Sequence, residues 1–189
     1  MTSKPIYTCS SCGKEHEVWP ALCYNSPTAY QNLSAADQQQ YGQLDADFCI
    51  ITYPDQTDRF IRITYTQQVI DHCENLEYGL WVSLNETSFQ DYADHFREDD
   101  HENKYFGWLS NALPEYDFSK GSIPTTVYTR PNQQRPYIIP HDDFDHPFVH
   151  DYYNGITKEE AERRVQEMLQ QNEERDIKNK QSKPWWKFW

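Results

Sequence analysis

The amino-acid sequence predicts an α+β fold, with a mixed or antiparallel sheet of about five short strands and roughly two to four helices packed on it. Segments rich in β-branched and aromatic residues are mixed with segments that carry apolar residues at helical spacing. They do not follow the regular strand–helix alternation of a doubly wound sheet. Aromatic residues make up 15% of the chain, so we expect a core built from large rings.

The strand predictions depend on residue type and turn chemistry. Residues 47–53 and 59–65 are predicted to form a hairpin, because Pro54 and Asp55 between them favour a turn. The remaining predicted strands are residues 78–84, 125–130 and 136–139.

A helix is predicted over residues 86–97, with Asn85 as its N-cap. Phe89, Tyr92 and Phe96 follow at helical spacing, so this helix is expected to lie on the sheet with its aromatic side inward.

The last helix has the clearest start signal in the sequence. Thr157 is a predicted cap, and Glu160 three residues later completes a capping box. After Gln170 the pattern becomes polar, so we expect the helix to project or fray there. The apolar residues that repeat at helical spacing are Ala161, Val165, Met168 and Leu169.

Two further helices are predicted over residues 27–41 and 106–113, and the acidic, His-rich segment 140–151 is predicted to be a loop. Trp81 and Trp108 lie within apolar segments, so both are predicted to be core residues.

The chain of 189 residues is long enough for one domain to bury most of its apolar surface. We predict a single α+β domain over residues 1–175, which begins with a segment resembling a zinc knuckle. Residues 176–189 form a basic, Trp-rich tail.

The tail combines lysines with exposed aromatic side chains, which are costly to leave in water. It is expected to dock in a groove of a partner protein, on the body of this chain, or transiently at a membrane interface. The predicted partner-binding residues are Trp185, Trp186, Phe188 and Trp189.

The formal net charge of −13 points away from nucleic acids and anionic lipids, whose charge has the same sign. It suits a basic protein partner, and simple solubility is the other explanation. No stretch approaches the ~20 apolar residues of a membrane span, and Met1 to Pro5 contain no apolar signal region. With five cysteines, an odd number, we expect a cytoplasmic protein that keeps its cysteines as thiols or metal ligands.

The spacing Cys9-x2-Cys12, followed by Gly13 and His16, predicts a structural zinc site. Two thiolates on a tight turn can hold one tetrahedral zinc, and His16 is the third predicted ligand. A zinc ribbon would contain a second Cys-x2-Cys pair, which this sequence lacks, so free thiols or a redox pair are the alternatives. The candidates for the fourth ligand are Cys23, Cys49, Cys73 and His146.

No catalytic residue is predicted. The segment from His141 to Asp151 matches no metalloenzyme signature, because Pro140 and Pro147 interrupt helical spacing. Neither Ser83 nor Ser110 lies in a Gly-x-Ser-x-Gly elbow, and six glycines leave little room for a phosphate-binding loop.

Several short motifs lie along the chain from its start to the last helix. They are Tyr7, Cys9, Cys12, Gly13, His16, Asp47, Cys49, Gly79 to Leu84, Tyr105 to Leu109, Gln134 to Pro136, His146, Pro147 and Gly155 to Thr157. Together they resemble an uncharacterised bacterial family, domain of unknown function 2199, over roughly residues 7–170. The resemblance implies a bacterial cytoplasmic protein in which Cys9, Cys12 and His16 belong to one unit, with Cys49 as a further ligand. Cys23 and Cys73 do not match this pattern.

The leading functional hypothesis is a non-enzymatic protein-binding module, in its narrower form an immunity-type inhibitor of a basic partner. The alternative is a metal-dependent, hydrolase-like enzyme that uses the N-terminal Cys/His cluster, with Asp145 or Glu15 as base.

Overall fold

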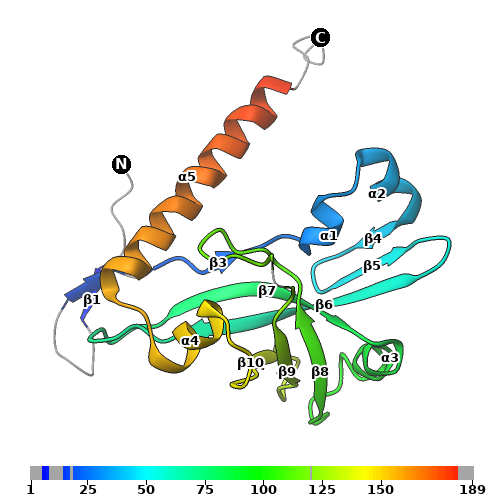
Figure 1. Cartoon of the computed structure of the whole chain (residues 1–189), viewed down its shortest axis with the longest axis horizontal. Coiled ribbons are helices and arrows are strands. Elements are labelled where there is room, and N and C mark those ends of the chain that lie inside the picture. Colours follow the sequence, from blue (N-terminus) through cyan, green and yellow to red (C-terminus); the bar gives the residue numbers. More distant parts are fainter. Residues whose placement is uncertain (1–5, 9–14, 18, 120, 183–189) are drawn as a thin grey trace.

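The computed structural model describes residues 6–8, 15–17, 19–119 and 121–182 (Figure 1). Within them, β1 (Ile6–Thr8) and β2 (Glu15–Glu17) form a small antiparallel sheet of their own. The other eight described strands form one sheet, so the α+β class is confirmed and the prediction of about five strands was too low. Local patterning did not reveal the extra strands, because most of them are only two or three residues long.

Five strands of the large sheet close into a barrel. Successive barrel strands pair antiparallel, and the last returns to the first in parallel, with Tyr137 opposite Thr64. Because the first and last barrel strands pair with each other, neither leaves an unpaired edge where they meet. The barrel strands are β6 (Thr57–Gln67), β7 (Leu76–Leu84), β8 (Lys104–Leu109), β9 (Pro124–Tyr128) and β10 (Tyr137–Pro140).

The two longest strands also carry the sheet beyond the barrel. One edge of β6 pairs with β7 along its length, and the other is divided between β10 and β5 (Phe48–Thr52). The far edge of β7 is likewise divided between β8 and the parallel strand β3 (Leu22–Cys23). Strand β4 (Gly42–Leu44) continues the sheet beyond β5.

The described residues contain five helices, one more than the upper end of the prediction. In Figure 1, α3 lies at one end of the barrel, α4 at the other, and α5 projects away from the sheet. Among the described residues, no helix combines the length and apolar character needed to cross a bilayer. The helices are α1 (Thr28–Gln31), α2 (Ala35–Tyr41), α3 (Glu86–Asp94), α4 (Pro147–Asn154) and α5 (Lys158–Ser182).

The core has two parts. The larger cluster joins the inward side chains of the barrel to Phe148 and Val149 of α4 and Val165 of α5. The smaller one contains Cys49 and Trp81, and the side chains of α1 and α2 pack against it. Large rings contribute to both clusters, as expected from the composition.

Several local predictions are confirmed. The hairpin forms as β5 and β6, and α3 begins after Asn85, whose side chain accepts a hydrogen bond from the Ser88 N–H. Helix α5 begins after Thr157, whose hydroxyl accepts from the Glu160 N–H at 3.2 Å. The helix then continues across the predicted boundary at residue 175 to Ser182. The division into domain and tail itself stays a prediction.

Four local predictions were wrong. Residues 106–113 do not form a helix: β8 occupies residues 104–109, because its alternating side chains suit the barrel wall. Trp108 is consequently 44% exposed, although Trp81 is fully buried as predicted. The segment 140–151 is not all loop, because Pro147 opens α4 at a position where its missing N–H is harmless. The predicted helix over residues 27–41 is divided into α1 and α2.

Candidate functional site

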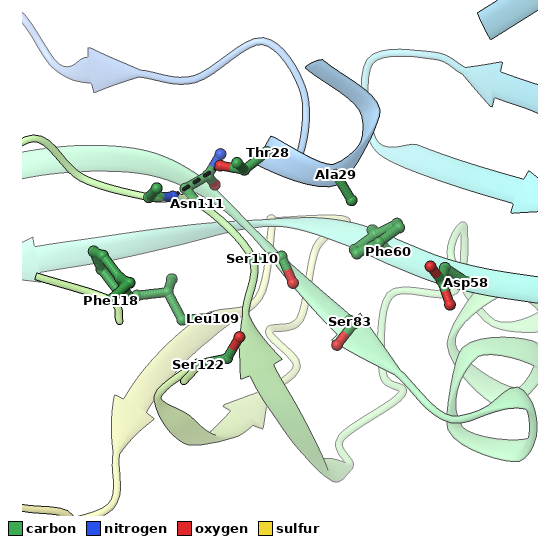
Figure 2. A pocket seen from close by; sticks show the side chains of 11 residues that line it. Thr28, Ala29, Asp58, Phe60, Ser83, Leu109, Ser110, Asn111, Phe118 and Ser122 are labelled. Atoms are coloured by element: carbon green, nitrogen blue, oxygen red, sulfur yellow. Dashed lines mark hydrogen bonds between the residues drawn. The ribbon is translucent and has the colours of Figure 1, made fainter. Parts of the chain in front are cut away.

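A groove of about 390 Å³ lies between α1 and the strands β6, β7 and β8. In Figure 2, the hydroxyl groups of Ser83, Ser110 and Ser122 face a common space between them. Phe60 and Leu109 supply apolar walls, so the groove offers both apolar contact and hydrogen-bonding groups. The residues that line it are Thr28, Ala29, Asp58, Phe60, Ser83, Leu109, Ser110, Asn111, Ala112, Phe118 and Ser122.

Two of the four hydroxyls that line this groove take part in structural contacts. Ser110 Oγ donates to the Trp108 carbonyl at 2.9 Å, and Thr28 Oγ1 accepts from the Ala112 N–H at 2.8 Å. Within the described residues, no lining hydroxyl is hydrogen-bonded to a histidine or carboxylate that could activate it as a nucleophile.

Beside the groove, β8 presents two aromatic side chains to solvent. Phe106 is 45% exposed and Trp108 44% exposed, whereas Tyr105 before them and Leu109 after them point into the core. The two exposed rings meet edge to face, with centroids 5.0 Å apart. Large aromatic side chains exposed side by side are a usual mark of an interaction site.

The exposed rings belong to a continuous surface. A second hollow, of about 500 Å³, is lined by Trp108 and Phe144 and shares Ser83 and Ser122 with the groove. We call Phe106, Trp108, Phe144 and Tyr153 the aromatic face.

On its other side, Phe106 contacts the ring of His141, with centroids 5.6 Å apart. His141 lines a third hollow, of about 430 Å³, together with Tyr153 and the exposed carboxylates of Asp142 and Asp143. The aromatic face thus runs along one side of the barrel and has acidic residues at its rim.

The sequence prediction missed this face. In the structure, the stretch from Lys104 to Leu109 alternates between exposed and buried side chains, which is the period of a strand with one face in solvent. Its sequence, Lys-Tyr-Phe-Gly-Trp-Leu, has large aromatic side chains on both faces, so no alternation of polar and apolar residues distinguishes this strand from the helix predicted over residues 106–113.

The predicted zinc ligands are only partly described. Cys9 and Cys12 lie outside the described residues, and His16 belongs to β2, where it pairs with Tyr7. Cys49 is fully buried in β5, and burial, together with Asp45, raises the pKa of its thiol to about 12. In that environment the thiol is neutral, whereas zinc binds the thiolate. The proposed zinc set of Cys9, Cys12, His16 and Cys49 stays a prediction.

The other predicted functional residues are distributed over the molecule. Trp185, Trp186, Phe188 and Trp189 lie outside the described residues, so the docking of the tail stays a prediction as well. His146 is buried and caps α4 by accepting from the Phe148 N–H at 3.1 Å. His141 contacts the Thr126 hydroxyl at 3.1 Å. The His-rich segment therefore positions a helix and a strand rather than forming one cluster.

Comparison with known proteins identifies a family but no characterised relative. No curated protein and no solved structure matches the chain. A family model described as "Uncharacterized protein conserved in bacteria (DUF2199)" matches residues 8–156, a range that includes every barrel strand and the whole aromatic face. The chain therefore belongs to the bacterial family DUF2199.

Proposed function

We propose that this protein is a non-enzymatic binding module that holds a basic protein partner against its aromatic face. The observation that supports this is the pair of exposed rings on β8, Phe106 and Trp108, beside a groove with apolar walls. Aromatic side chains of this size, gathered on one surface, are the residues that most often dominate binding energy at protein interfaces.

The charge distribution favours a basic partner. The chain carries a formal net charge of −13, and the exposed carboxylates of Asp142 and Asp143 stand at the rim of the aromatic face. Opposite charge on the partner would speed its approach and exclude acidic competitors, while the rings supply the affinity.

A narrower form of this proposal is an immunity-type inhibitor that covers a basic partner protein in the bacterial cytoplasm. Two of the described cysteines, Cys23 and Cys49, are free thiols, as is usual in a reducing compartment. A structural zinc held by the N-terminal Cys/His cluster belongs to the same proposal, and its role would be to stabilise the fold.

The test begins with a photo-crosslinking amino acid at Lys104, which lies on the same outward row of β8 as Phe106 and Trp108. The crosslinked partner is identified in the native bacterial host and purified. Its affinity is then measured for the full chain and for a Phe106→Ala/Trp108→Ala double variant. We expect the double variant to bind about 30-fold more weakly or worse, which corresponds to the loss of a hot spot.

The matched control is Leu44→Ala, which removes an apolar side chain of similar exposure on β4, outside the aromatic face. This variant should bind the partner as the unchanged chain does. Binding should also weaken with added salt, because the charges at the rim are exposed. A partner bound equally well by the double variant, or no crosslinked partner at all, would overturn the proposal.

A further inference from the structure

Two histidines and an aspartate converge beside α3, at a place separate from the aromatic face. Asp91 lies in the last turn of this helix, His95 four residues later is its C-cap, and His101 comes from the loop that leads into β8. The distance is 3.2 Å between His101 Nε2 and Asp91 Oδ2, and 3.6 Å between His95 Nδ1 and Asp91 Oδ1. None of the three lines the groove or its two neighbouring hollows.

The two imidazoles lie one on the other. Their ring centroids are 4.1 Å apart and their planes differ by only 8°. All three side chains are half-buried, so an ion from solvent can reach them while the walls of the site still limit their motion. Among the described residues, this is the one group of three or more histidine, cysteine and acidic side chains with ligand atoms within 4.8 Å of one another.

Neighbouring groups fix the carboxylate in place. The Tyr105 hydroxyl donates to Asp91 Oδ2 at 2.6 Å, and the Asn103 amide donates to the same oxygen at 2.9 Å. The Tyr105 ring is buried in the core, so its hydroxyl is held rigidly. Metal-binding carboxylates and imidazoles in proteins are usually oriented by an outer layer of hydrogen bonds of this kind.

The hydrogen bonding also determines which nitrogen of His95 can act as a ligand. His95 Nδ1 lies 2.7 Å from the main-chain carbonyl of Asp91. A carbonyl oxygen only accepts, so Nδ1 carries the proton and the lone pair of the neutral ring is on Nε2. A backbone carbonyl that fixes the tautomer is a common partner of metal-bound histidines.

We propose that Asp91, His95 and His101 bind a divalent transition-metal ion, with zinc as the best fit, through one carboxylate and two imidazoles. Nitrogen and oxygen ligands of this kind suit zinc and its neighbours in the first transition row, whereas calcium and magnesium prefer sites made of oxygen alone. Ligand atoms around tetrahedral zinc are roughly 3.4 Å apart, given bonds of about 2.0–2.2 Å. The 3.2 Å between His101 Nε2 and Asp91 Oδ2 is close to that spacing, and one ligand atom of each of the three residues lies within 4.8 Å of the other two.

Three protein ligands leave at least one position of a tetrahedral ion open for water or for a group of a bound molecule. This site shares no ligand with the zinc predicted at Cys9, Cys12, His16 and Cys49. The two can therefore be measured separately.

The experiment titrates the full chain with cobalt(II) and zinc(II), in the unchanged sequence and in a Cys9→Ser/Cys12→Ser background. The absorption spectrum of bound cobalt(II) shows which side chains hold it, because cysteine thiolates add a charge-transfer band that histidine and carboxylate ligands lack. We expect the serine background to bind one cobalt per chain without thiolate absorption. Zinc should displace it and should raise the thermal midpoint, because the ion binds the folded state.

In the serine background, His101→Ala should abolish this cobalt spectrum, and Tyr105→Phe should weaken binding by about tenfold or more through loss of the hydrogen bond to Asp91. Tyr105→Phe keeps the buried ring, so it tests the site even if His101→Ala does not fold. The matched control is His150→Ala, since His150 also forms an exposed pair with a carboxylate, 3.2 Å from Asp145, but has no third ligand.

The control should bind cobalt as the parent does. Absence of cobalt binding in the serine background would overturn the proposal. Binding that survives both His101→Ala and Tyr105→Phe would overturn it equally.

Discussion

Arg164 Nη2 lies 2.8 Å from Asp151 Oδ2, and this contact joins the last helix, α5, to α4. The guanidinium is only 3% exposed and also contacts Glu160 at 2.7 Å and the Tyr116 hydroxyl at 2.8 Å. The Tyr116 hydroxyl in turn donates to Asp151 at 2.6 Å. The buried charge of Arg164 is tolerated because these partners all accept hydrogen bonds from it, and two of them are carboxylates.

Replacing Arg164 with Met should destabilise the protein strongly. The change leaves Asp151 and Glu160 without their common partner, a guanidinium that is only 3% exposed. Breaking a fully buried pair costs about 3–5 kcal/mol, and because each carboxylate side chain is 30% exposed we expect about 2–3 kcal/mol here. The measurement is the free energy of unfolding in urea. Arg163→Met is the matched control, because Arg163 contacts the same Glu160 from a position with a 46% exposed side chain. It should cost less than about 1 kcal/mol, and equal losses for the two variants would contradict this account.

Glu160 should make stability depend on pH in the acid range. Hydrogen bonds from Arg163, and then from Arg164, lower the pKa of its carboxyl to about 2. Because the folded pKa is below the unfolded value of about 4.3, its contribution is complete above that value and is lost as pH falls toward 2. The difference in unfolding free energy between the unchanged chain and Glu160→Gln should therefore shrink from about pH 5 downward. A difference that stays constant over this range would show that the two arginines do not hold the ionised carboxylate.

Asn111 should be more important to stability than its position after β8 suggests. Its side chain is 2% exposed, accepts from the Trp81 N–H at 2.7 Å and donates to the Ser26 carbonyl at 3.0 Å. Asn111→Ala leaves both main-chain groups without these partners, so we expect a loss of about 2–4 kcal/mol. Asn154→Ala is the control, because that exposed amide donates only to the His150 carbonyl, and it should cost about 1 kcal/mol or less. Equal losses would mean that water replaces Asn111.

Two glycines with positive φ should respond differently to alanine. Gly155 has φ +79°, and a Cβ there would lie 2.9 Å from Ile70 Cγ1 and 3.3 Å from the Gln68 carbonyl oxygen. Gly121 has φ +111°, and a Cβ would meet nothing within 4 Å. Gly121→Ala should cost about 1–2 kcal/mol from backbone strain, and Gly155→Ala should cost about 1–3 kcal/mol more from crowding. Thermal unfolding of both variants gives the comparison, and an equal cost would show that Ile70 moves aside freely.

Much of the secondary structure was predictable because its causes are local. Asn85 and Thr157 are capping residues whose side chains accept hydrogen bonds from backbone N–H groups three residues later. Pro54 and Asp55 make the turn between the two strands of the hairpin. None of these effects requires a distant segment. The family resemblance was also visible in short motifs of the sequence, and it is confirmed.

The site could be predicted only in part. The close approach of Asp91 and His95 could have been predicted, because they are four residues apart within the helix predicted over residues 86–97. His101 is added by the path of the following loop, which no local pattern specifies. In the same way, Trp108 was assigned to the core from its apolar neighbours, whereas the pairing of β8 with β9 directs its ring outward.

By itself, then, the sequence determined the α+β class, the central hairpin, the two capped helices and the family. The tertiary structure alone decided that the strands close into a barrel, with Tyr137 beside Thr64, more than seventy residues earlier in the chain. Closure depends on pairing between distant segments and on burial from both sides, and neither leaves a periodic trace in a short stretch of residues. The aromatic face and the three-residue cluster beside α3 are consequences of that closure, since both depend on how β8 is held between its neighbours.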